Sequence, residues 1–146
     1  MATLFSGIMA GIAAAIFMGA ASEIAYRMGL FNSSLFLIDG SFFLRFTHKE
    51  PGKGNYLAGI PVHLFTGAVF GAIYVSITYF FGLNPFLPGL VAFYFFLLWL
   101  SMLFIALPIA GQGMLGRKAS PRTWLEQLFL HVIFGVGYYY SLITLA

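Results

Sequence analysis

The chain closes with WLEQLFLHVIFGVGYYYSLITLA, residues 124–146, in which no residue after Glu126 carries a charge. A helix needs about 20 mostly apolar residues to cross the hydrocarbon core of a bilayer. This closing run is long enough and apolar enough for that purpose. It therefore predicts a transmembrane helix.

Two further runs, residues 1–22 and 54–116, also lack charged side chains, and the second is long enough for two crossings. Hydrophobic residues make up 61% of the chain and charged residues only 8%, whereas soluble domains are about 25% charged. We therefore expect an all-α fold with a single transmembrane domain, residues 1–146. It should be a polytopic four-helix up-down bundle with spans at about 4–28, 56–81, 89–109 and 121–146.

The first apolar run has no Lys or Arg before Arg27, so it lacks the basic start of a signal peptide and is expected to be retained. Its residues Gly7, Gly11, Ala15 and Gly19 recur every four positions and predict a ridge that another helix can approach closely, including one from a second copy. The absence of cysteine excludes disulfides and thiolate-held clusters or zinc.

Charged residues outside the helices fall in the connections after the first and third helices. The positive-inside rule places these connections in the cytoplasm and both termini outside, in what we expect to be a prokaryotic inner membrane. Because the basic residues flank the membrane, no nucleic-acid partner is expected. The first of these connections, residues 31–55, contains an apolar stretch too short to span, which predicts an interfacial or re-entrant segment. Gly40 interrupts it and leaves its helicity open.

A spacing in the last helix is repeated in the second. Tyr56 lies seven residues before His63 and Gly67 four after it, and Trp124, His131 and Gly135 follow the same spacing. At 1.5 Å per residue, each histidine lies about 10 Å beyond an aromatic residue typical of the membrane interface. Because the second and fourth helices of an up-down bundle are parallel and diagonal, the two imidazoles are expected to face each other at one depth.

This arrangement predicts a b-type haem between His63 and His131, with Gly67 and Gly135 clearing space for the porphyrin and Arg27 near a propionate. Arg45 and Lys49 are further candidates for the propionates, and Gly71 extends the cleared face. The corresponding function is a small membrane subunit that serves electron transfer or a larger respiratory or oxidase-like complex.

Three other interpretations stay open. Glu23 with His63 and His131 makes a two-histidine, one-carboxylate site for an iron or copper ion, or else a proton or ion relay. The chain can also be a structural accessory subunit without a cofactor, in which the histidines only pack and Glu23 only pairs with Arg27. Met102, at similar depth, is expected in the core rather than as a ligand. No phosphate loop, nucleophile elbow or HExxH helix is present, so no catalytic residue is predicted and an enzyme acting alone is not expected.

The glycine-rich first helix, PVHLFTGAVFGAIY, LPIAGQGMLG and LHVIFGVGYYY together resemble an uncharacterised family of small four-span bacterial and archaeal membrane proteins. The likeness covers most of the chain apart from residues 31–55. It implies four spans with a histidine in the second and fourth, and it carries no assigned activity. The expected partners are the lipid bilayer and either other membrane subunits or further copies of the chain.

Overall fold

A computed structural model describes residues 2–46 and 55–146, and within these ranges the chain is helical with no strand. Four helices are long and apolar enough to cross a membrane, which confirms the all-α prediction and its four long helices. The elements in chain order are α1 (Leu4–Arg27), α2 (Leu35–Phe46), α3 (Asn55–Phe80), α4 (Pro88–Ser101), the π-helical η1 (Met102–Ala106), α5 (Leu107–Ile109), the 3-10 turn η2 (Met114–Gly116) and α6 (Thr123–Leu145).

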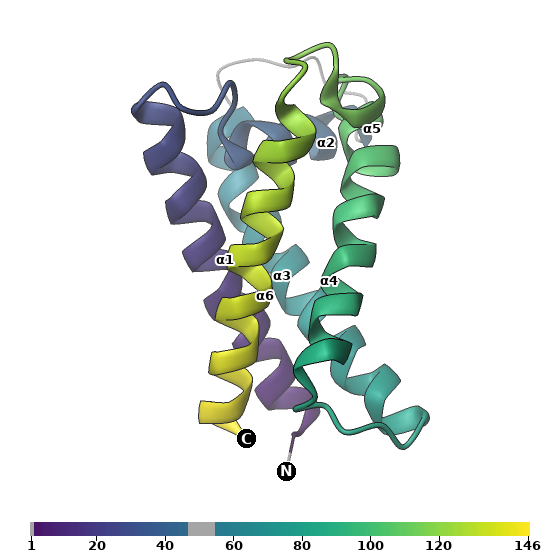
Figure 1. Cartoon of the computed structure of the whole chain (residues 1–146). Helices are drawn as coiled ribbons and strands as arrows, with labels where there is room; N and C mark the ends of the chain where they lie inside the picture. The colour runs from purple at the N-terminus through teal and green to yellow at the C-terminus, as the bar shows by residue number, and fades with distance from the viewer. Residues whose placement is uncertain (1, 47–54) are drawn as a thin grey trace.

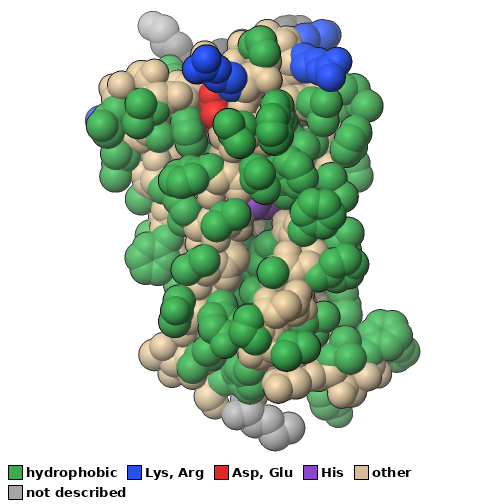
Figure 2. Space-filling model, viewed as in Figure 1, with side chains coloured by type: hydrophobic (Ala, Val, Ile, Leu, Met, Phe, Trp, Pro, Cys, Tyr) green, Lys and Arg blue, Asp and Glu red, His purple; other side chains and the backbone are tan. Residues whose placement is uncertain are grey.

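The long helices run alongside one another, with both termini at one end and α2 at the other (Figure 1). Helix α1 packs against both α3 and α6, and α4 packs against α6. The short helix α2 lies across the start of α3. Exposed basic side chains gather at the α2 end (Figure 2), and the described ones are Arg27, Arg45, Arg117, Lys118 and Arg122. Lys49 and the turn at residues 51–54 lie outside the described residues.

The small-residue ridge of α1 is buried against α3. A Cβ on Gly11 would run into the carbonyl oxygen of Gly67, and a Cβ on Gly71 would run into that of Gly7. The two backbones can approach this closely only because glycine has no side chain at these positions. The ridge is therefore used inside the chain, and it is not the open surface for a second copy that the spacing suggested.

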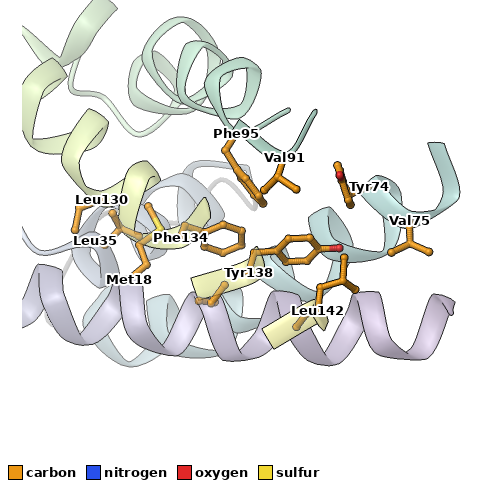
Figure 3. Close-up of a cluster of buried hydrophobic side chains, with 13 residues drawn as sticks. Met18, Leu35, Tyr74, Val75, Val91, Phe95, Leu130, Phe134, Tyr138 and Leu142 are labelled. Carbon is orange, nitrogen blue, oxygen red and sulfur yellow. The ribbon is translucent and has the colours of Figure 1, made fainter. Parts of the chain in front are cut away.

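An aromatic cluster from α3, α4 and α6 fills the half of the bundle nearer the chain termini (Figure 3). Tyr138 is 0% exposed, its ring lies 5.4 Å from that of Tyr74, and its hydroxyl donates to the Gly71 carbonyl oxygen at 3.0 Å. The hydroxyl groups of Tyr74 and Tyr94 likewise donate to backbone carbonyl oxygens. Each of these three tyrosine hydroxyl groups thus has a hydrogen bond, as burial requires.

Helix α4 continues through η1 and α5 as a single run, Pro88–Ile109. Within it the Leu107 N–H donates to the Met102 carbonyl oxygen, five residues earlier, which is the π-helical hydrogen bond. Pro108 follows directly and has no N–H to restore the normal pattern. Such single π turns occur frequently at functional sites.

The apolar segment between the first two long helices is helical, which settles what Gly40 left open. A Cβ on Gly40 would run into the backbone of Asn55, and a Cβ on Gly59 would run into the backbone of Phe36. The two glycines therefore let α2 press directly on the first turns of α3. Gly40 permits close packing here instead of ending the helix.

Candidate functional site

A cavity of about 70 Å³ lies between the helices toward the α2 end. It brings together His63, His131 and Met102, as their expected common depth predicted, and it adds Asp39 from α2. Gly67 also lines it, whereas Glu23, Arg27 and Gly135 do not. The complete lining is Met18, Leu35, Asp39, His63, Thr66, Gly67, Phe70, Leu98, Met102, His131 and Phe134.

His63 connects α3 to both α1 and α2. Its side chain is only 7% exposed; Nε2 lies 3.0 Å from the Ala15 carbonyl oxygen and Nδ1 lies 2.8 Å from Asp39 Oδ2. The ring reaches the α1 backbone because residues there are small: a Cβ on Gly19 would lie only 3.3 Å from its Cδ2. Phe36 packs edge-on against the imidazole from α2, with ring centroids 5.7 Å apart.

These two hydrogen bonds determine how many protons the pair carries. A carbonyl oxygen can only accept, so Nε2 of His63 must donate and carry a hydrogen. Nδ1 of a neutral ring would then present a lone pair to Asp39, and an ionised carboxylate also offers only lone pairs. A contact of 2.8 Å therefore requires one more proton between them, on either His63 or Asp39. With that proton on either Nδ1 or Oδ2, the Asp39–His63 pair has no net charge.

His131 has a different set of contacts. Its Nδ1 lies 2.8 Å from the carbonyl oxygen of Gln127, one turn earlier, so Nδ1 carries the hydrogen of the neutral ring. Nε2 is then a hydrogen-bond acceptor, and no described residue donates to it. The ring lines the cavity on one side and a larger groove on the other.

This groove runs between α4 and α6 on the outside of the bundle and has a volume of about 480 Å³. Figure 2 shows a histidine surface in the hollow between apolar side chains on this face. Gly135 lines the groove, and a Cβ there would lie 3.1 Å from Phe95 Cδ2. The complete lining is Pro88, Val91, Ala92, Phe95, Phe96, Trp99, Leu128, His131, Val132, Gly135, Val136, Tyr139 and Tyr140.

Glu23 binds other partners than the histidines. Its Oε1 accepts from Arg27 Nε at 2.6 Å, and its Oε2 accepts from the Ser34 hydroxyl at 2.9 Å. Arg27 is 74% exposed. The glutamate therefore ties the start of α2 to α1, and the structure does not bring it together with His63 and His131. Across residues 2–46 and 55–146, no three His, Asp or Glu side chains are grouped closely enough to hold a metal ion.

The residues present do not fit a haem held between the two imidazoles. Both ring nitrogens of His63 are engaged, and a Cβ on Gly67 would lie 2.6 Å from the Ala15 Cβ, so α1 fills the space that a porphyrin would need. The cavity is also far smaller than the roughly 300–1,000 Å³ of ordinary ligand sites. Gly67, four residues after His63, instead lets α1 pack closely against α3. Gly135, four residues after His131, lets Phe95 pack closely against α6.

Asp39 is a candidate site residue that the sequence pattern did not single out. It is the sole acid in the apolar stretch SSLFLIDGSFFLRF, and an ionisable group in an apolar segment is a candidate site by default. Glu126 was also overlooked: its carboxylate accepts from the Asn32 side chain at 2.7 Å and so fixes the α1–α2 connection to α6.

In comparisons with known proteins, no family model, no curated protein and no solved structure matches this chain. What the site does is therefore inferred from its own residues.

Proposed function

We propose that the chain is an integral membrane protein that takes up and releases one proton at the Asp39–His63 pair. Four helices with the length and composition of membrane spans support insertion, and the basic residues at the α2 end favour a cytoplasmic position for that end. Both termini would then face outward. The accessory role in a redox complex that the sequence suggested stays a prediction.

The observation that carries this proposal is the bridge that His63 makes between the Ala15 carbonyl and Asp39. The bridge requires the additional proton, and the pair borders the cavity instead of being sealed in packed side chains. A water molecule occupies about 30 Å³ in the liquid, so the cavity has room for about two. Such waters would have Asp39 and Thr66 as polar partners.

The half of the bundle nearer the chain termini favours proton exchange with the α2 side alone over proton conduction across the membrane. The hydroxyl groups of Tyr74, Tyr94 and Tyr138 are all committed to backbone carbonyl oxygens, and apolar rings fill the space between them. No chain of free hydroxyl groups continues from the cavity through these three tyrosines. We therefore propose a protein that exchanges a proton with the α2 side and passes it to a ligand or a partner subunit.

Nitrogen NMR of histidine-labelled protein in lipid bilayers tests the proposal. In the wild type, Nε2 of His63 should carry a hydrogen and Nδ1 should show a shared or bound proton. In Asp39→Asn, the amide can donate to Nδ1, so Nδ1 should become a plain acceptor while Nε2 stays protonated. Glu23→Gln is the matched control, because it removes a carboxylate outside the cavity, and it should leave the His63 signals unchanged. Unchanged His63 signals in Asp39→Asn would overturn the proposal.

A further inference from the structure

The groove between α4 and α6 combines an apolar body with one polar group. Its walls are aliphatic and aromatic, with Phe95, Phe96 and Trp99 on the α4 side and Tyr139 and Tyr140 on the α6 side. Its volume of about 480 Å³ is that of an ordinary small-ligand site. Walls of this kind bind flat rings well, because aromatic rings gain from edge-on and offset stacking.

The polar group is His131, and its hydrogen bond to Gln127 fixes what it can recognise. Since Nδ1 donates to the Gln127 carbonyl oxygen, Nε2 is an acceptor and selects a ligand that donates. The phosphodiester of a phospholipid can only accept, so it does not match this acceptor. The depth also differs, because His131 lies seven residues, or about 10 Å, inside Trp124.

From these features we infer that the groove binds a lipid-soluble ligand with an aromatic ring and a hydroxyl group, of the phenol or hydroquinone class. The ring lies between the aromatic walls, the hydroxyl donates to His131 Nε2, and an apolar tail extends along the groove into the lipid. This inference rests on the membrane insertion in the proposed function, but not on the shared proton. His131 also lines the inner cavity, so its ring lies between the groove and the cavity that Asp39 and His63 border.

Binding can be measured with 4-nonylphenol and its matched control 4-nonylanisole, in which a methyl group replaces the donating hydrogen. The chain has two tryptophans, so Trp124→Phe leaves Trp99 as the single fluorophore, in the wall of the groove. We expect both compounds to quench Trp99 saturably, with the phenol bound about 2- to 12-fold more tightly, which corresponds to one hydrogen bond. In His131→Phe the two affinities should become equal, and His131→Gln, which restores an acceptor, should recover part of the difference.

Equal affinities in the Trp124→Phe protein would overturn the inference and leave a groove for lipid chains. Lack of saturable binding would also overturn it and would indicate that another helix covers the groove. Val136→Phe narrows the groove without touching His131, and it should weaken both compounds together. Asp39→Asn should leave both affinities unchanged while altering the His63 nitrogen signals, so failure of this inference and failure of the proposed function are distinguishable.

Discussion

Removing either member of the Asp39–His63 pair should destabilise the bundle by clearly different amounts. His63→Ala leaves the Asp39 carboxylate, 19% exposed, without its partner and also removes the contacts with Ala15 and Phe36. Breaking a buried charged pair from one side costs about 3–5 kcal/mol. Asp39→Ala leaves one ring nitrogen unsatisfied, at a cost of about 1–3 kcal/mol. Asp39→Asn keeps a hydrogen bond to Nδ1 and loses only its charge assistance, or about 1 kcal/mol.

Reversible unfolding in mixed micelles, followed by circular dichroism, gives the free energy of each variant. The order of destabilisation should be His63→Ala, then Asp39→Ala, then Asp39→Asn. The double variant Asp39→Ala/His63→Ala should cost less than the sum of the two single variants by about 1–3 kcal/mol, because the second change removes a group that the first has already left unpaired. Additive costs, within about 0.5 kcal/mol, would refute the pair as the source of this stability.

Three other predictions concern the rest of the bundle. Gly11→Ala should destabilise by about 1–3 kcal/mol, because its Cβ collides with the Gly67 carbonyl, whereas Gly89→Ala, with open space around it, should be nearly neutral in the same unfolding assay. The purified protein should show no haem absorption, and a sharp reduced α-band lost in His63→Ala or His131→Ala would restore the bis-histidine interpretation. Liposomes containing the protein alone should leak protons no faster than empty ones under an imposed pH gradient. Faster flux would contradict the proposal that the half of the bundle around Tyr74, Tyr94 and Tyr138 offers no path for protons.

The long helices were predictable because each is an uninterrupted apolar run, and the placement of His63 and His131 on one cavity followed from counting residues inward from Tyr56 and Trp124. Hydrophobic length and helical rise are local properties, so they can be read from the sequence directly. Only part of the role of the α1 glycine ridge could be predicted. Its spacing indicated close approach of a helix, but the identity of that helix depends on tertiary packing.

The choice of carboxylate could not be made from the sequence. Glu23 lies in a long apolar run at a depth close to that of the histidines, while Asp39 lies in a segment that Gly40 interrupts. Only the folding of α2 back onto α3, made possible by Gly40 and Gly59, brings Asp39 to His63. The tautomers also required the structure, because they depend on the carbonyl oxygens of Ala15 and Gln127.

Three of the four acidic residues hold α2 and the connection before it: Glu23 through Ser34, Glu126 through Asn32, and Asp39 through His63. By contrast, most of the α1–α3 contact is close packing of glycine backbones, which needs no charged side chain. Loss of these side-chain hydrogen bonds should therefore loosen the corner at α2 while the long helices stay packed against one another. Hydrogen exchange should then be faster in residues 28–46 than in the long helices.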